Sequence, residues 1–278
     1  MGIQIVPISV RFGNEEFLDG VEITHEEFYT RLAECDELPK TSQPSPDTFM
    51  KVFNEAVAAG DDVLGIFISS DLSGTYQSAC LAALDVEEET EKKLYMVDSR
   101  SASIGTALLI REAVKLRDAG VNVADIAAAC TEMSKYIKLT AVVGSLKYLK
   151  MGGRLSGAAA FAGTMLHITP VVSIEDGKVV VIGKTRGKKA AEKLMHDKLI
   201  KDGLSLTRDF MFGHINCSES LETFINKSLT YISDVNGNVG VSSIGCSVGT
   251  HVGPGTYGIA YVEAAESGMN RESIVKTA

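Results

Sequence analysis

The chain has 278 residues, 45% of them hydrophobic, which suits one large or two modest domains with a substantial core. Its formal net charge of -9 argues against general nucleic-acid binding. No apolar run is long enough to span a bilayer and no signal-peptide pattern begins the chain, so we expect a cytoplasmic protein with at most transient membrane contact. The cysteines are scattered without CxxC spacing, which predicts reduced thiols and no metal site.

The first segments of the chain predict a strand and two capped helices. Residues 3–10 alternate and are rich in branched side chains, as in a strand. Thr24, followed three residues later by Glu27, forms a capping box that marks the start of a first helix. Ser45 as N-cap and Pro46 at the first helical position mark the start of a second helix.

The stretch at the centre of the N-terminal half organises the predicted fold. Residues 63–68 are a short run of branched apolar side chains, typical of a buried parallel strand. Small polar residues follow, and we expect a helix to begin at Ser73, with Gly74 allowing a ligand to approach the backbone. Such a unit presents free N–H groups at the carboxyl edge of a sheet, where α/β proteins bind ligands and a helix end favours an anion.

The N-terminal half continues with alternating strands and helices. The expected elements are strands at 93–97 and 139–143 and helices at 103–119 and 123–136. This alternation predicts an α/β domain with a doubly wound, mainly parallel sheet and right-handed crossovers.

The second half predicts a smaller α/β domain with antiparallel pairing. The segment KMGGRLSGAAAFAG predicts a glycine-rich loop that opens a helix of small residues, and a hairpin with the turn Asp176–Gly177 follows. The change of pattern lies near residue 155, so we expect an N-terminal α/β domain at 1–155 and a C-terminal one at 156–278. The later elements are helices at 188–200 and 218–232, strands at 210–215 and 239–244, and then a loop and a last strand.

Three residues in predicted loops are the main candidates for a binding site. Thr41 lies just before a proline, Ser73 at a helix start, and His251 among glycines. Taken singly, each has a simpler explanation, as a turn residue, a helix cap and a loop histidine. Taken together, two hydroxyls and an imidazole near a helix N-terminus can converge on one carboxylate and bind it through neutral donors.

Two other functions stay open beside carboxylate binding. Ser73 and His251 suit the nucleophile and base of a serine acyl hydrolase or acyltransferase, but Ser73 lies in Leu-Ser-Gly-Thr and not in a G-x-S-x-G elbow. The other alternative is an interaction protein whose pocket has lost its role. The absence of an elbow makes carboxylate binding the favoured hypothesis.

Basic residues gather at two places in this acidic chain. Arg154 lies in the glycine-rich loop, which suits an anion but lacks the Walker lysine pattern, so a tight turn with a solvated arginine is the simpler explanation. A second cluster opens a predicted helix, where positive charge opposes the helix dipole. Either a solvated helix start or a partner surface explains this cluster, which comprises Lys184, Arg186, Lys188 and Lys189.

Several segments of the chain resemble motifs of the DegV family, and they occur in the family's order. They extend over about Ile5 to Val262. Members of that family usually begin with a strand that carries an Asp-Ser or Asp-Thr pair and with a helix, and this chain lacks that first strand and helix. The matching segments are LPKTSQPSP, ISSDLSGTYQSA, VDSRSAS, LKMGGRLS, ITPVVSIEDGKV, KTRGKKA and THVGPGTYGI.

This resemblance implies a two-domain protein that holds one long-chain fatty acid in a tunnel between its domains. It implies a FakB-like subunit that presents the fatty acid carboxylate to a separate fatty acid kinase catalytic protein, which forms the acyl phosphate with ATP. The subunit itself is then not an enzyme and has no cofactor besides the bound lipid. The resemblance assigns carboxylate binding to Thr41, Ser73 and His251, and kinase docking or phosphoryl transfer to Arg154 and Arg186.

Overall fold

The computed structural model describes residues 1–264, apart from 36, 157–167, 206, 231 and 233–235. Its N-terminal elements are β1 (Ser9–Phe12), β2 (Glu15–Leu18), α1 (His25–Glu34), β3 (Lys40–Ser42), α2 (Pro46–Ala58), β4 (Leu64–Phe67), α3 (Thr75–Thr90), β5 (Tyr95–Asp98), α4 (Ile104–Asp118), α5 (Val123–Met133) and β6 (Ile137–Val142). The later elements are α6 (Lys147–Met151), β7 (Thr169–Glu175), β8 (Lys178–Thr185), α7 (Lys188–Asp202), β9 (Phe210–His214), α8 (Ser218–Ser228), β10 (Val239–Ser243), α9 (Cys246–Val252) and β11 (Tyr257–Val262).

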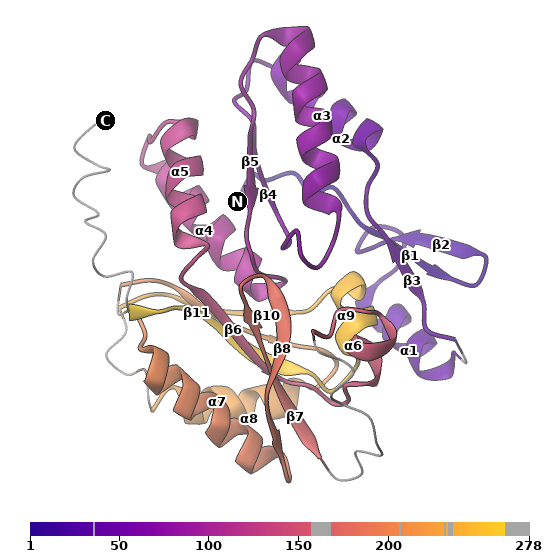
Figure 1. Ribbon diagram of the computed structural model, residues 1–278, viewed down its shortest axis with the longest axis vertical. Coiled ribbons are helices and arrows are strands. Elements are labelled where there is room, and N and C mark those ends of the chain that lie inside the picture. The colour runs from indigo at the N-terminus through magenta and orange to yellow at the C-terminus, as the bar shows by residue number, and fades with distance from the viewer. Residues whose placement is uncertain (36, 157–167, 206, 231, 233–235, 265–278) are drawn as a thin grey trace.

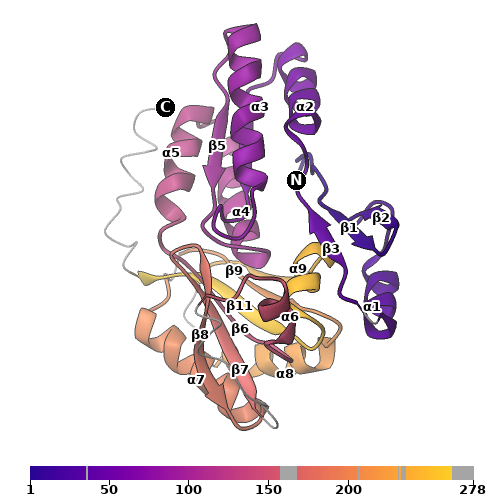
Figure 2. The ribbon, with the colours of Figure 1, turned by 45° about the vertical axis from the view of Figure 1, so that its right-hand side comes forward.

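The described elements assemble into an α/β fold with three sheets, which confirms the predicted class. Strands β4 and β5 form a parallel pair beside α2 and α3, and β2-β1-β3 form a small antiparallel sheet next to α1 (Figure 1). The largest sheet has six strands in the order β10-β9-β11-β6-β7-β8. Helices α7 and α8 cover one face of this sheet, while α4 lies between the sheet and the β4–β5 pair (Figure 2).

Alternation along the strands of the large sheet gives it two different faces. On β11, Tyr257, Ile259 and Tyr261 pack in the core beneath α7 and α8, whereas Ala260 faces the α4 side. Successive strand residues point to opposite faces, so one strand supplies both layers. The face toward α4 is the one that also borders the cavity described below.

The parallel part of the fold is smaller than the alternation of strands and helices predicts. Among the described strands, only β4–β5 and β9–β10 pair in parallel. Strand β6 does not extend the β4–β5 pair, because β11 pairs with it along its whole length, from Ile137 to Val142, and β7 pairs with its other edge. Strand β11 follows β6 far along the chain, where local periodicity gives no information about pairing.

The predicted local start and turn signals are confirmed at several positions. The Glu27 amide donates to Thr24 Oγ1 at 3.2 Å and the Thr24 amide to Glu27 Oε2 at 2.9 Å, so the capping box forms. Ser45 caps α2. The turn Asp176–Gly177 joins β7 and β8 with φ of 48° and 81°, the left-handed values that a type I′ turn requires.

Two elements near the candidate residues differ from their prediction. Helix α3 begins at Thr75 with Gly74 as its N-cap, so Ser73 lies just before the cap position. His251 does not lie in a loop but in the last turn of the short helix α9. Glycine-rich sequence favoured a loop there, whereas tertiary contacts stabilise the helix. Most of the predicted helix of small residues falls in 157–167, outside the described residues.

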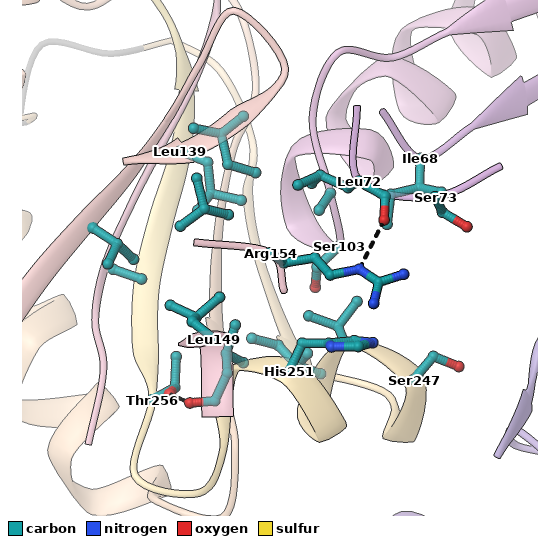
Figure 3. Close-up of a pocket in the computed structure, with 18 of the residues that line it drawn as sticks. Ile68, Leu72, Ser73, Ser103, Leu139, Leu149, Arg154, Ser247, His251 and Thr256 are labelled. Atoms are coloured by element: carbon teal, nitrogen blue, oxygen red, sulfur yellow. Dashed lines mark hydrogen bonds between the residues drawn. The ribbon is translucent and has the colours of Figure 1, made fainter. Parts of the chain in front are cut away.

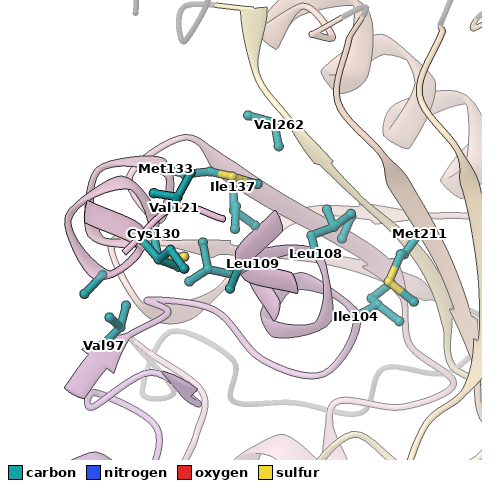
Figure 4. Close-up of a cluster of buried hydrophobic side chains, with 14 residues drawn as sticks. Val97, Ile104, Leu108, Leu109, Val121, Cys130, Met133, Ile137, Met211 and Val262 are labelled. Atoms are coloured by element: carbon teal, nitrogen blue, oxygen red, sulfur yellow. The ribbon is translucent and has the colours of Figure 1, made fainter. Parts of the chain in front are cut away.

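One hydrophobic core lies between α4, α5, the β4–β5 pair and the large sheet, and it joins these two sheets. Leu108 and Leu109 of α4, Cys130 of α5, Val97 of β5 and Ile137 of β6 are all buried in this cluster (Figure 4). Burial of such side chains stabilises the fold by roughly 1.5–3 kcal/mol each relative to exposure. The cluster therefore fixes the orientation of β4 and β5 above the large sheet.

The predicted division into 1–155 and 156–278 remains a prediction. Strand β6 lies before residue 155 in the chain, yet it is a central strand of the large sheet, whose other strands follow that residue.

Among the described helices, none combines the length and hydropathy of a membrane span.

An ion-pair network connects α4 to Asp209, the residue just before β9. The Asp209 carboxylate, only 4% exposed, accepts hydrogen bonds from Arg111 Nε at 2.8 Å, Lys115 Nζ at 2.7 Å and the Asn238 amide at 3.0 Å. Burial alone would raise the pKa of Asp209, but these donors outweigh it and lower the pKa from 3.8 to about 2.

We expect Asp209→Asn to lower the free energy of unfolding by about 2 kcal/mol near neutral pH. The folded-state pKa lies below the unfolded value of 3.8, so this stabilisation is present above that pH and is lost as the pH falls toward 2. Urea unfolding of both proteins over this pH range measures the effect. A penalty that stays constant down to about pH 2 would contradict the assignment.

Candidate functional site

Three distant segments bring the predicted carboxylate-binding residues to one cavity. Thr41 lies on β3, Ser73 in the loop before α3 and His251 on α9, and all three line the cavity. Thr41 Oγ1 and His251 Nε2 are 3.0 Å apart and hydrogen bonded. The cavity volume is about 160 Å³. Because one water needs only roughly 10–15 Å³, this void is a binding-sized cavity and not a packing defect.

The rest of the cavity wall is mainly apolar. On β6, Leu139 and Ala141 point into the cavity, whereas Val142 packs in the core beneath α7. The cavity thus lies between the large sheet and the loop that follows β4, with Leu139 and Leu149 far from Ser73 (Figure 3). The apolar lining includes Ile68, Leu72, Leu139, Ala141, Val143, Leu149, Val172, Ile174 and Val179.

His251 is held as a neutral imidazole at the polar end. Burial, followed by the positive charge of Arg154, lowers the pKa of His251 from 6.5 to about 4. Its Nδ1 is buried and has no hydrogen-bond partner within the part of the chain that the structure describes. A Cβ at Gly152 would lie 2.3 Å from Nδ1, so the imidazole rests directly on this glycine.

Ser73 adds a hydroxyl beside the start of α3. Its Oγ is 2.8 Å from Thr75 Oγ1 and accepts the Thr75 amide at 3.4 Å. Helix α3 has 16 residues, and its first turn carries N–H groups without intrahelical partners, which favour an anion. The predicted N-cap role of Ser73 is wrong, because Gly74 is the N-cap of α3, while carboxylate binding by Ser73 stays a prediction.

Arg154 brings a positive charge to the polar end of the cavity. Its Nε donates to the Leu72 carbonyl at 3.1 Å and its Nη1 to the Gly152 carbonyl at 2.6 Å. In Figure 3 the guanidinium lies between the Ser73 loop and the imidazole of His251. The structure therefore groups Arg154 with the three candidate residues.

Arg186 lies elsewhere. It follows β8, is exposed, and is not among the residues that line the cavity. Lys184, Lys188 and Lys189 beside it are exposed as well, and Lys188 Nζ donates to Ser220 Oγ at 2.9 Å. The basic cluster is thus a surface feature around the start of α7.

Sequence reasoning missed four polar residues of the cavity wall: Gln43, Ser103, Ser247 and Thr256. Gln43 had a usable signal, because it lies two residues after Thr41 on an extended segment and such residues face the same side. Ser247 lies four residues before His251, a helical spacing that only becomes visible once α9 is known.

One group of side chains away from the cavity has the composition of a metal site. Ligand atoms of Asp19, His25 and Cys246 lie within 4.8 Å of one another. However, the two Asp19 carboxylate oxygens accept the amides of Cys246 at 3.0 Å and Ser247 at 2.8 Å. Asp19 thus supplies the cap of α9 from outside the helix, and this structural role accounts for its position.

An α/β fold with a largely apolar cavity and a few convergent polar groups is typical of proteins that bind a small ligand. The family model described as "Uncharacterised protein, DegV family" matches residues 1–264. The chain belongs to the DegV family, which confirms the resemblance of its motifs.

Relatives of known sequence or structure are similar over nearly the whole chain. A DegV domain-containing protein of Clostridium acetobutylicum is 36% identical over 269 residues, covering 93% of this chain and 90% of the relative. A fatty-acid-binding DegV family protein from Thermus thermophilus is 31% identical with a TM-score of 0.83, covering 94% and 92% of the two chains. The Streptococcus pneumoniae Fatty Acid Kinase B3 protein, loaded with linoleic acid, shares the fold at 22% identity and a TM-score of 0.82, covering 93% and 90%.

We expect the His251 imidazole to titrate near pH 4 in an NMR experiment, since burial lowers its pKa to about 4 from 6.5. Because the unfolded chain binds this proton more readily, the protein should lose stability as the pH falls from 6.5 toward 4. Arg154→Gln should raise the pKa only partway, because burial is the larger cause. An imidazole that titrates near 6.5 in the wild-type protein would contradict this account.

Proposed function

We propose that this protein binds a long-chain fatty acid, with the carboxylate at Thr41, Ser73 and His251 and the acyl chain along the apolar wall. The observation that carries the proposal is one cavity that Thr41, Ser73 and His251 all line and whose wall is otherwise largely apolar. The Thermus thermophilus relative, which is described as a fatty-acid-binding protein, supports the same ligand class.

The two ends of the cavity then have different energetic roles. Burial of an acyl chain contributes roughly 0.8 kcal/mol per methylene, so about a dozen methylenes give on the order of 10 kcal/mol before ordering costs. Charge-assisted hydrogen bonds contribute about 1.5–3 kcal/mol each. We therefore propose that the apolar wall sets affinity and the hydroxyls set the position of the carboxylate.

Contacts at the polar end favour binding over ester hydrolysis. A serine hydrolase needs a base that is hydrogen bonded to the nucleophile and oriented by a third group. Here the Nε2 of His251 pairs with Thr41 and Ser73 pairs with Thr75. Among the described residues, none bonds to the Nδ1 of His251 and orients it.

We further propose that the bound carboxylate is presented to a separate fatty acid kinase catalytic protein in the cytoplasm, so that this chain is not itself an enzyme. Arg154 lies at the carboxylate end, and Arg186 lies in an exposed basic cluster that suits an acidic partner surface. The likeness in fold to the Streptococcus pneumoniae Fatty Acid Kinase B3 protein motivates this assignment. The ligand then lies in a tunnel between domains 1–155 and 156–278.

Mass spectrometry of an organic extract of the pure protein tests the ligand class directly. We expect a long-chain fatty acid to be carried through purification. Ala141→Phe places a large side chain in the cavity and should abolish retention of the fatty acid. Ala59→Phe, at an exposed position after α2 and outside the cavity, is the control and should not change retention. An empty wild-type protein that also fails to bind added palmitic acid would refute the proposal.

The division of roles is tested by two substitutions at the polar end. Thr41→Ala and Ser73→Ala should retain most of the bound lipid but lower acyl-phosphate formation by about ten-fold or more in a mixture with a fatty acid kinase catalytic protein and ATP. The exposed neighbour Ser42, changed to Ala, is the matched control. Arg186→Ala, away from the cavity, should lower the same rate without loss of lipid.

Equal and complete loss of lipid in Thr41→Ala and Ser73→Ala would show that the hydroxyls determine affinity, contrary to this division. Hydrolysis of an ester substrate by the purified protein alone would instead support the enzyme alternative.

A further inference from the structure

We infer that Gln43 is a positioning residue that fixes the distance between the Thr41 and Ser73 hydroxyls, an inference that rests on the proposed function. Gln43 connects the strand that carries Thr41 to the helix start that follows Ser73. Its amide lies against Gly74 and donates a hydrogen bond to the Ser78 side chain.

On the strand side, Gln43 follows the end of β3 by one residue. Thr41 and Gln43 are two residues apart and both line the cavity, although Gln43 is also partly open to solvent like Ser42, and Ser42 between them does not line it. This alternation is that of an extended chain. Any shift of the Gln43 side chain is therefore transmitted to Thr41 through a short, extended piece of backbone.

On the helix side, Gln43 Nε2 donates to Ser78 Oγ at 2.7 Å, and the Ser78 residue is only 5% exposed. Its Oε1 lies so close to Gly74 that a Cβ there would be 2.3 Å away. Gly74 has a φ of -72°, which any residue adopts. A side chain at position 74 would therefore displace the Gln43 amide, which occupies that space.

Ser73 immediately precedes Gly74, so the same contact locates its hydroxyl. Two hydroxyls on separate elements bind one carboxylate well only if their separation matches the carboxylate, because hydrogen bonds weaken steeply with poor geometry. The bridge from Gln43 to Gly74 and Ser78 supplies that constraint. The Thr41–His251 pair fixes the same strand from the other side.

The test compares palmitic acid with hexadecanol, which has the same number of carbons but a hydroxyl group in place of the carboxylate. Gln43→Ala removes the bridge, and Gly74→Ala displaces the amide from the opposite side. Each should weaken binding of palmitic acid by about five-fold while changing the affinity for hexadecanol less than about two-fold. The double variant should be no weaker than either single one, since both remove the same contact.

A spectroscopic readout separates positioning from general packing. Hydroxyl donors lower the pKa of a bound carboxylate, so ¹³C NMR titration of carboxyl-labelled palmitic acid should show a higher pKa in both variants than in the wild type. Gln77→Ala, at an exposed glutamine of α3 outside the cavity lining, is the matched control and should behave as wild type.

Equal weakening of acid and alcohol, or variants indistinguishable from Gln77→Ala, would overturn the inference while leaving the proposed function intact. Failure of the wild-type protein to bind palmitic acid would remove the proposed function, and this inference with it.

Discussion

The hydrogen bond between Thr41 and His251 joins the beginning of the chain to its end at the polar end of the cavity. It pairs a hydroxyl on a short strand with an imidazole on a short helix, and neither element is stable alone. Strand β3 is held by β1, and α9 is capped by Asp19 from the segment after β2. The small N-terminal sheet therefore supports both partners of this bond.

The large sheet supplies the other half of the site. Because strand residues alternate, β6 and β7 direct one set of side chains into the core beneath α7 and another set into the cavity. A substitution at Ala141 and one at Val142 thus act on different properties, although the residues are adjacent. One face of the large sheet packs in the hydrophobic core beneath α7 and α8, and its other face lines the cavity.

Burial and the positive charge of Arg154 both lower the pKa of His251 at the polar end. Burial keeps His251 neutral, while Arg154 is held beside it by the Leu72 and Gly152 carbonyls. The polar end suits a ligand with a single negative charge, because it offers a neutral imidazole, two hydroxyls and one fixed cation. Such a ligand need not displace a counter-ion from the pocket. This combination distinguishes the site from a phosphate loop, which relies on successive backbone N–H groups.

The sequence by itself determined the α/β class, the capped helices at Thr24 and Ser45, the Asp176–Gly177 turn and the candidate residues Thr41, Ser73 and His251. These features depend on side-chain periodicity, on local capping and turn chemistry, or on motifs. Only the tertiary structure decided that β6 joins the second half, that His251 lies on a helix, that Arg186 is remote from the cavity and that Gln43 bridges to Gly74. Each of these depends on contacts between segments far apart in the chain, and no local pattern records which distant segment a strand or side chain will meet.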